Sequence, residues 1–347
     1  CGQNPLRGYD EARQLFLREY GQELMASQVR KPEGQSCTSI VILSCNTYGY
    51  TRACIESIRK YTAPGTYELI VVDNGSTDQS GEWLKQQRDI HCIFNKKNEG
   101  FPRGCNQGMQ AAAGTELLLL NSDTVVTTRW LEQLKTALYS SEAIGAVGCV
   151  TNHSAGRQQI DTAYRNPSEL QAFARQYNHT DPGKWEETLK LVGFCFLLKR
   201  EIYDRLGGLD EQFSPGNFED DDYSLRIWQA GYRLLLCRDT FIHHEGNASF
   251  LQSLAAGDRA KKIQRYNAML DRNAALFEKK WQIPAGYGQL QVELLNTMLA
   301  AGVPDRILEL DCGCGADLLC LRALRRDVQL RGITSSSNRS PASITAT

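Results

Sequence analysis

The residues best placed to do chemistry stand where strand-like segments end. The segment Glu116–Val126 (ELLLLNSDTVV) runs four leucines into Asn121, Ser122 and Asp123. An apolar run closed by polar turn residues is typical of a buried strand in a largely parallel sheet. Ligands of such sheets bind beyond the carboxyl ends of the strands. Asp123 is therefore a candidate ligand for a divalent cation, although alone the segment fits a strand and an Asx turn equally well.

Two more strand-like segments end in polar residues. Ser39–Ser44 (SIVILS) is followed by Cys45 and Asn46, and the YELIVV segment ending at residue 72 is followed by Asp73 and Asn74. A carboxylate in this position suits a ribose hydroxyl or a base edge, and the alternative is that Asp73 and Asn74 only cap a turn. Because three such ends converge on one sheet edge, we predict a nucleotide site there, which includes Ser44, Cys45, Asn46 and Ser122.

The segment NEGFPRGCNQG (Asn98–Gly108) adds candidates for nucleotide binding. Gly100, with the glycines at 104 and 108, is predicted to allow close approach of the backbone to a ligand. Arg103 suits a diphosphate and Asn106 a base, which needs a donor and an acceptor. A G-x-x-x-x-G-K-[ST] motif is absent from the sequence, so a P-loop nucleotidase is excluded.

The densest acidic cluster is EDDD, which starts at Glu219 and continues through Asp220, Asp221 and Asp222. Acids at a helix start also favour the helix dipole, which is the alternative explanation. Like charges this close raise a pKa when partly buried, and a general base for a hydroxyl requires such a carboxylate.

Two of the five histidines, His243 and His244, are adjacent. Imidazole is a common metal ligand, and a ligand role for one of them weighs about equally with a structural role.

Composition limits the partners. The chain has 347 residues, enough for roughly two domains, and Lys plus Arg (39) nearly balance Asp plus Glu (40), so we expect no nucleic-acid partner. The sequence contains no apolar run long enough for a transmembrane segment and no apolar signal core at its start. We expect a cytoplasmic protein, with peripheral attachment to the inner membrane face left open. The twelve cysteines fit reduced thiols, and Cys312 and Cys314 lack the second pair of a zinc site.

Strands alternate with helices from Thr38, which predicts an α/β fold with a mainly parallel sheet. Helices are expected at 51–61, 77–87, 106–113, 129–140, 167–177, 200–206 and 220–230, and a strand pair or long strand at 189–199. The predicted parts are an N-terminal helical extension (1–35), a catalytic domain (36–250), a helical segment (251–304) and a last segment (305–347) with a disordered tail.

Six motifs in order resemble family 2 glycosyltransferases with the GT-A fold, which has a Rossmann-like sheet, and most closely their bacterial rhamnosyltransferase-like branch. The resemblance covers about residues 38–250. The matching segments are SCN at 44–46, VVDNGSTD at 71–78, N-x-GF-x-x-G-x-N-x-G at 98–108, LLLN-x-DT at 118–124, ED-x-D at 219–222 and H-x-x-G at 243–246.

This resemblance implies an inverting, metal-dependent transfer of a hexosyl or deoxyhexosyl group from a UDP- or dTDP-linked sugar. The acceptor would be a saccharide, lipid-linked or protein-linked hydroxyl in bacterial polysaccharide or glycoconjugate synthesis. It implies that Asp123 binds Mn²⁺ or Mg²⁺ with His244 or His243, and that Asn121 replaces the first carboxylate of the Asp-x-Asp motif. Asp220 would be the base, and Glu219 and Asp222 would orient the acceptor, Asp220 and Arg226.

The segment ILELDCGCGADLLCLRAL, which begins at Ile307, resembles the first motif of S-adenosylmethionine-dependent methyltransferases. The next strand, Leu330–Thr334, lacks the usual acidic end, so we expect a truncated segment without methyltransferase activity. For the whole chain a second hypothesis stays open because of Asn121. It is a non-catalytic protein that binds a nucleotide sugar or acts as a scaffold on the same fold.

Overall fold

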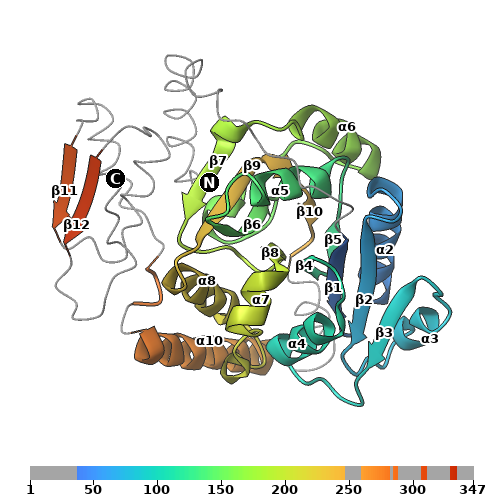
Figure 1. Ribbon diagram of the computed structural model, residues 1–347. Coiled ribbons are helices and arrows are strands. Elements are labelled where there is room, and N and C mark those ends of the chain that lie inside the picture. Colours follow the sequence, from blue (N-terminus) through green and yellow to red (C-terminus); the bar gives the residue numbers. More distant parts are fainter. Residues whose placement is uncertain (1–36, 247–258, 282–283, 288–305, 311–328, 334–347) are drawn as a thin grey trace.

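An eight-stranded sheet forms the centre of the molecule (Figure 1). The computed structural model describes residues 37–246, 259–281, 284–287, 306–310 and 329–333. The strand order is β3-β2-β1-β4-β8-β6-β9-β7. The strands are β1 (Thr38–Ser44), β2 (Tyr67–Asp73), β3 (Ile90–Phe94), β4 (Glu116–Asn121), β6 (Ile144–Val150), β7 (Trp185–Thr188), β8 (Cys195–Lys199) and β9 (Arg233–Phe241).

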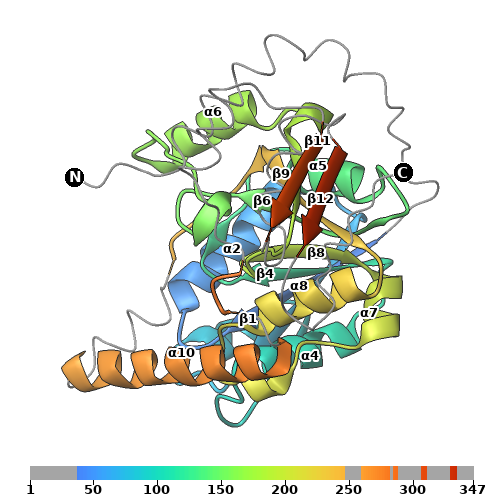
Figure 2. The same ribbon diagram turned by 90° about the vertical axis from the view of Figure 1, so that its left-hand side faces the viewer.

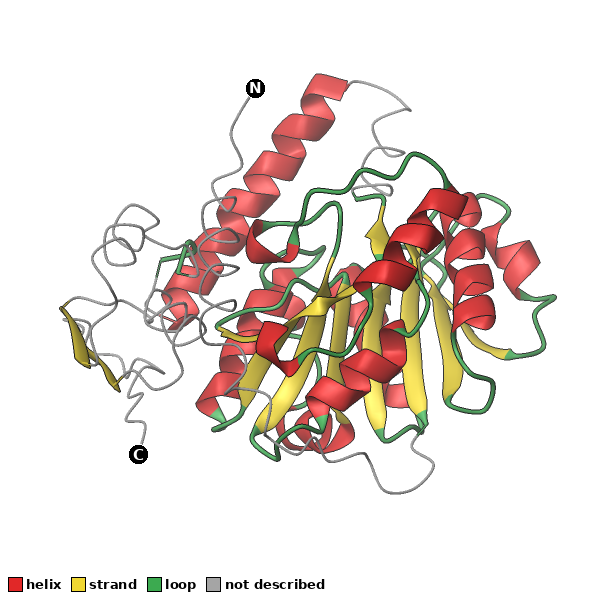
Figure 3. Ribbon diagram, turned by 90° about the horizontal axis from the view of Figure 1, so that it is seen from above, coloured by secondary structure: helices red, strands yellow, loops and turns green. Residues whose placement is uncertain are grey.

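Helices cover both faces of this sheet, as the view from above shows (Figure 3). They are α2 (Tyr48–Tyr61), α3 (Ser80–Leu84), α4 (Phe101–Ala111), α5 (Trp130–Leu138), α6 (Pro167–Tyr177), α7 (Arg200–Leu206), α8 (Glu219–Gln229) and α10 (Arg259–Trp281). Short 3-10 turns are η2 (Gly156–Gln158), η3 (Pro182–Lys184) and η4 (Glu211–Phe213). Two small pairs complete the description: β5 (Thr124–Val125) with β10 (His243–His244), and β11 (Arg306–Leu310) with β12 (Gln329–Ile333).

Side chains of the central strand β1 point alternately into two hydrophobic cores. Ile40 and Ile42 are buried in the core that includes residues of α2 and α5, whereas Val41 is buried with residues of α4, α7 and α8. This alternation follows from the two-residue period of a strand. Strands β3, β2, β1 and β4 are parallel to one another, as are β6 and β9, while β7 and β8 run antiparallel to their neighbours. The predicted α/β class with a mainly parallel sheet is confirmed.

The register of the sheet brings the predicted strand ends together. Ser44 of β1 lies opposite Asp73 of β2, and Leu43 lies opposite Asn121 of β4. The polar residues that follow these three strands therefore share one edge, as the sequence pattern predicts.

The glycines of α4 correct one prediction. The helix begins at Phe101, five residues earlier than expected, so Gly104 and Gly108 lie inside it. A Cβ at either position would lie 2.3 Å from Leu43 Cδ1 or Val41 Cγ1. These glycines thus let α4 pack closely on β1, and they do not offer backbone to a ligand.

Two other predicted elements are shorter than expected. The helix predicted at 77–87 is limited to α3, because Asp78 lies in a turn where its carboxylate accepts the N–H groups of Tyr48 and Ser80. The strand predicted at 189–199 exists only as β8, and Gly193 and Phe194 belong to the loop before it.

Some predicted features lie outside the described residues: the N-terminal helix, the segment at 311–328 with Cys312 and Cys314, and the tail. β11 and β12, which flank that segment, are parallel. Of the eight cysteines described, all are unpaired and five are buried. None of the described helices has the length and apolar character that crossing a membrane requires.

Candidate functional site

The loops after β1 and β2 are joined by hydrogen bonds. Asn46, in the left-handed region with φ 54°, accepts the N–H of Thr77 at Oδ1 over 2.7 Å and donates its own N–H to Ser76 Oγ over 2.9 Å. Asp73, which is 5% exposed, accepts the N–H of Ser76 at 3.0 Å. Asp73 and Asn46 thus belong to two loops that are hydrogen-bonded to each other at the sheet edge, where the nucleoside site is predicted.

Asn74 is predicted to contact the nucleotide, but every hydrogen-bonding group of its side-chain amide is bonded within the protein. Its Nδ2 donates to Asn98 Oδ1 and to the carbonyl of Gly100, and its Oδ1 accepts from Asn95 Nδ2 and the N–H of Glu99, all between 3.0 and 3.2 Å. An amide has two donor hydrogens and two acceptor lone pairs, so no capacity is left for a ligand. The side chain of Asn74 therefore orders the loop before α4.

The side-chain amide of Asn106, which is predicted to contact a base, is also bonded within the protein. Its amide donates to the carbonyl of Leu209 and accepts the N–H of the same residue, at 2.9 and 2.7 Å. It also donates to Glu211 at 3.1 Å. These bonds tie α4 to the loop after α7, and they replace the predicted contact with a base.

Other nucleotide candidates differ in their surroundings. Ser44 is fully buried and hydrogen-bonded to Thr51 at 2.9 Å, and Ser122 lies 3.3 Å from Thr47 Oγ1. The thiol of Cys45 is half-buried and accepts from Asn98, and burial raises its pKa. Ser44 and Ser122 thus belong to a buried network of hydroxyl groups at the sheet edge, whereas Cys45 is more exposed.

Gly100 and Arg103 lie at the start of α4. Gly100 has φ 88°, which favours glycine, and a Cβ there would lie 2.7 Å from Ser214 Oγ. Arg103 is exposed and its guanidinium lies 3.8 Å from Glu99. The guanidinium is therefore accessible, whereas Gly100 is fitted against another loop of the protein.

Asp123 and His244 face each other at the end of β4. The His244 Nε2 atom lies 3.2 Å from Asp123 Oδ1 and 3.3 Å from Asn121 Nδ2. His244 Nδ1 lies 2.8 Å from the carbonyl oxygen of His153, which can only accept, so Nδ1 carries the proton. With the proton on Nδ1, Nε2 can accept from Asn121 Nδ2 and also lies beside the Asp123 carboxylate. Two facing acceptors are stabilised by a cation between them, so this pair fits a divalent metal.

The donor set is small. Within the described residues, no group of three or more His, Cys, Asp or Glu side chains gathers as a metal site. Asp123, His244 and the side chain of Asn121 would supply only part of a coordination sphere, and substrate oxygens and water would supply the rest.

His243 lies apart from this pair. Neighbouring strand residues point to opposite faces, and the ring of His243 is hydrogen-bonded to Tyr164 Oη at 2.6 Å and Glu245 at 3.2 Å. The alternative that His243 is the metal ligand is therefore not supported by the geometry.

Asp220 and Glu219 begin α8. The Asp220 carboxylate accepts the N–H of Gly193 at 2.8 Å and that of Asp221 at 2.9 Å. Burial, followed by the charge of Asp221, raises the pKa of Asp220 to about 6. Glu219 is 5% exposed, and burial followed by the charge of Asp220 raises its pKa well above its usual range. Its Oε2 has no hydrogen-bond partner among the described residues.

Asp222 does not join these two carboxylates. It is fully buried, and its oxygens bind Arg226 Nε at 2.9 Å, Trp281 Nε1 at 2.9 Å and Lys280 Nζ at 2.6 Å. The predicted contact with Arg226 is present, but these partners fix α8 to α10 and leave no oxygen for orienting an acceptor. We therefore correct the role of Asp222 to a structural one.

Two residues that the sequence pattern did not single out connect Asp220 with the Asp123–His244 pair. Gly193 donates to Asp220, and the next residue, Phe194, accepts the N–H of Asn121 at 2.9 Å and stacks on His244 with ring centroids 5.1 Å apart. A glycine inside an apolar run was the available signal, because it often marks an interruption of a strand. Asn152, which holds the backbone of His244 through two hydrogen bonds, carried no comparable signal.

The fold and the site together define an α/β protein whose carboxylate, imidazole and amide groups converge beyond the ends of parallel strands, where such sheets bind ligands. Residues 39–207 match the family model described as glycosyl transferase family 2. The match includes the edge formed by β1, β2 and β4, and it ends before α8.

Several known proteins are similar to this chain. The uncharacterized protein y4gI of Sinorhizobium fredii is 28% identical over 62% of this chain and 25% of that protein. The O-antigen biosynthesis protein RfbC of Myxococcus xanthus is 27% identical over 67% of this chain and 19% of that protein. The chain thus spans a quarter or less of these relatives. A crystal structure of GalNAc-T7 with UDP, GalNAc and Mn²⁺ gives a TM-score of 0.49 at 18% identity, covering 69% of this chain and 52% of that one.

Proposed function

We propose that this chain is a family 2 glycosyltransferase, an inverting and metal-dependent enzyme that moves a sugar from a nucleotide diphosphate to a hydroxyl. One observation carries the proposal. The Asp123–His244 pair lies at the carboxyl edge of the parallel strands, and one dipeptide, Gly193–Phe194, connects it with the Asp220 carboxylate. The match of residues 39–207 to the family model supports the same conclusion.

Asp123 and His244 would hold a cation that offsets the negative charge developing on the departing diphosphate. A mixed carboxylate and imidazole donor set favours Mn²⁺ over Mg²⁺, because Mg²⁺ prefers oxygen ligands. The Nδ1–H bond to the His153 carbonyl leaves a lone pair on Nε2, which is the usual arrangement around a metal-binding histidine.

Asp220 would accept the proton of the acceptor hydroxyl. A base works best when its pKa lies near the working pH, and a value of about 6 leaves Asp220 ionised at neutral pH while keeping its basicity above that of an ordinary aspartate. Asp73 and the loop of Asn46 would hold the nucleoside, and Arg103 remains a candidate for the diphosphate.

The donor and acceptor are proposed only as classes. We infer a UDP- or dTDP-linked hexose or deoxyhexose, rhamnose included, and a saccharide, lipid-linked or protein-linked acceptor. The name of the Myxococcus relative, an O-antigen biosynthesis protein, supports a role in bacterial polysaccharide synthesis. A non-catalytic nucleotide-sugar binder is the second candidate, because Asn121 stands where a second carboxylate is expected.

Calorimetry with UDP, dTDP and GDP, each with and without Mn²⁺, tests the metal assignment. We expect Asp123→Ala and His244→Ala to lose at least tenfold in Mn²⁺-dependent nucleotide affinity. His243→Ala is the matched control and should stay within about twofold of the wild type. Equal affinity of all variants in the presence and absence of Mn²⁺ would exclude this metal site.

A further inference from the structure

Asn273, in the second half of α10, is fully buried and faces the loop that leads into α8. Its Nδ2 lies 2.7 Å from the carbonyl oxygen of Phe213, 2.9 Å from that of Gly216 and 3.1 Å from that of Asn217. The two hydrogens of one amide are thus shared among three carbonyls of loop 213–218. Backbone carbonyls need donors, and the Asn273 amide donates to all three, while the carbonyl of Phe213 also accepts the N–H of Gly216 at 3.0 Å.

Loop 213–218 has an unfavourable backbone conformation. Asn217 has φ 73° and Phe218 has φ 74°, a region that residues other than glycine rarely adopt. Two such residues in succession persist only where surrounding contacts hold them. Phe218 is the last residue before α8, and its carbonyl accepts the N–H of Asp222 at 2.9 Å. The conformation of this loop therefore sets the position of Glu219 and Asp220.

Arg272 fixes the orientation of the Asn273 amide. Its Nε and Nη2 atoms donate to Asn273 Oδ1 at 3.0 and 2.7 Å, and Nη2 also donates to the carbonyl of Ser214. Because the guanidinium occupies the oxygen side of the amide, the NH₂ group must face the loop.

The other side of loop 213–218 contacts the nucleotide edge. The carbonyl of Pro215 accepts the N–H of Phe101 at 2.8 Å, and Ser214 leaves no space for a side chain at Gly100. The carbonyl of Gly100 in turn accepts from Asn74, the residue after β2. One loop thus connects α10, the nucleotide edge and the helix that carries Asp220.

We propose that Asn273 is a positioning residue for Asp220. By holding loop 213–218, it fixes the carboxylate relative to the strand edge that binds the donor. This inference rests on the proposed function, because Asp220 is the base only if sugar transfer takes place. Asn273 lies outside both the residues that match the family model and the segment 38–250 that carries the sequence resemblance.

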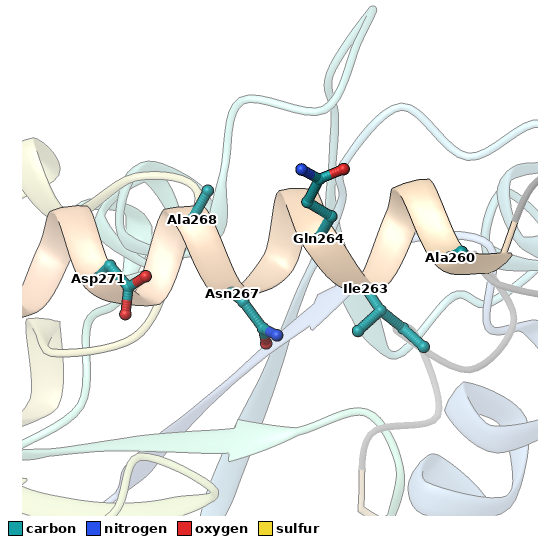
Figure 4. A pocket seen from close by; sticks show the side chains of 6 residues that line it. All are labelled: Ala260, Ile263, Gln264, Asn267, Ala268 and Asp271. Atoms are coloured by element: carbon teal, nitrogen blue, oxygen red, sulfur yellow. The ribbon is translucent and has the colours of Figure 1, made fainter.

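The test compares Asn273→Ala with two controls on the same helix. Asn267→Ala removes an exposed amide that lines a shallow pocket on α10 and has no hydrogen bond to the loop (Figure 4). Lys280→Met removes ion pairs to Asp210 and Asp222, at 2.7 and 2.6 Å, which dock α10, and a cation–π contact with the ring of Phe213, but it leaves the hydrogen bonds from Asn273 to the carbonyls of loop 213–218 in place. Because Asn273 is buried, Arg272→Ala is added as a milder variant of an exposed residue.

Three measurements are made: UDP affinity with Mn²⁺, release of nucleoside diphosphate as the sugar passes from UDP-glucose, UDP-galactose, UDP-N-acetylglucosamine or dTDP-rhamnose to an added saccharide or to water, and amide hydrogen exchange. We expect Asn273→Ala to lower kcat at least tenfold while UDP affinity stays within about twofold. Exchange should increase at residues 213–222 and remain unchanged at 117–125. Arg272→Ala should give a smaller change of the same kind, and Asn267→Ala none.

The two hypotheses fail in different ways. If the wild-type chain turns over none of the donors, the proposed function is contradicted. If the wild type is active and Asn273→Ala matches its kcat, or if exchange at 213–222 is unchanged, the positioning role is contradicted. An equal loss of kcat in Lys280→Met would also contradict it, because docking of α10 alone would then explain the effect.

Discussion

At the scale of single residues, the site depends on which of two adjacent carboxylates ionises. Asp220 accepts two backbone N–H groups, whereas Glu219 is buried and its Oε2 has no hydrogen-bond partner in the part of the chain that the structure describes. Hydrogen bonds to the charged form favour ionisation, and burial without them opposes it. Asp220 is therefore the carboxylate of the pair that ionises more readily, while burial holds the pKa of Glu219 well above its usual range.

The first prediction concerns Asp220→Asn. We expect turnover to fall by about 10²- to 10⁴-fold, which is typical for loss of a general base, while the affinity for UDP with Mn²⁺ stays within about twofold. Steady-state kinetics and calorimetry measure the two quantities. Asp204→Asn, an exposed aspartate on α7, is the control and should leave both unchanged. Wild-type turnover in Asp220→Asn would exclude Asp220 as the base.

The second prediction follows from the raised pKa of Asp220, about 6 in place of 3.8. In the wild type, kcat should rise with pH around a midpoint near 6, because the base must be ionised. A raised pKa in the folded state means that the stability contributed by the protonated form is lost as pH rises through 6. Asp220→Asn should then be about 1–2 kcal/mol more stable than the wild type at pH 8.

Urea denaturation at several pH values measures this difference. The two proteins should approach equal stability as the pH falls toward about 4. A stability difference that does not change between pH 4 and pH 8 would contradict the raised pKa.

The sequence predicted the residues whose positions follow from the end of a single strand. It did not predict the roles of residues whose hydrogen-bond partners lie far away in the chain. Asp123 and Asp73 follow apolar strands, so their place at the edge could be derived from the pattern. The amide of Asn106 is occupied by Leu209, 103 positions away, and no local pattern reports such a partner. His243 and His244 could not be separated by sequence alone, because their roles depend on which face of β10 turns toward Asp123.

At the scale of elements, the apolar runs predicted the strands well, and the helix boundaries were less certain. α4 begins at Phe101 because Pro102 suits a first helical turn, whereas the glycines had suggested a loop. The segment before β8 is as apolar as a strand, but Gly193 and Phe194 turn toward Asp220 and His244. Hydrophobicity alone could not distinguish burial against a site from burial within a sheet.

The packing of α4 on β1 gives a prediction at this scale. A Cβ at Gly108 would lie 2.3 Å from Val41 Cγ1, and valine has little rotamer freedom to move away. Overpacking costs about 1–3 kcal/mol and outweighs the gain of roughly 1 kcal/mol in helix propensity. Gly108→Ala should therefore lower the free energy of unfolding, as measured by chemical denaturation.

The control for this prediction is Gly49→Ala in α2. A Cβ there would have no atom of the described residues within 4 Å, so the substitution should be neutral or slightly stabilising. If Gly108→Ala proves as stable as Gly49→Ala, close packing is not the reason for the glycine.

At the scale of the whole molecule, α10 is packed against α8, the helix that carries Asp220. It lies beside α8, and its first half extends beyond the neighbouring helices (Figure 2). Phe277 is fully buried, stacks on Tyr287 with centroids 5.4 Å apart and contacts the ring of Phe218 at 5.6 Å. Leu189 and Leu225 belong to the same cluster. Residues beyond 250 thus contribute to the core around loop 213–218.

This packing predicts the effect of Phe277→Ala. Truncation of a buried phenylalanine typically costs 3–5 kcal/mol, and the loss should lower the midpoint of the main unfolding transition, because α10 and α8 share one core. Ile263→Ala, on the exposed half of the same helix, is the control and should change stability by less than about 0.5 kcal/mol. If α10 instead unfolded as a separate unit, Phe277→Ala would leave the main transition in place and add an earlier one that intrinsic fluorescence and circular dichroism report differently.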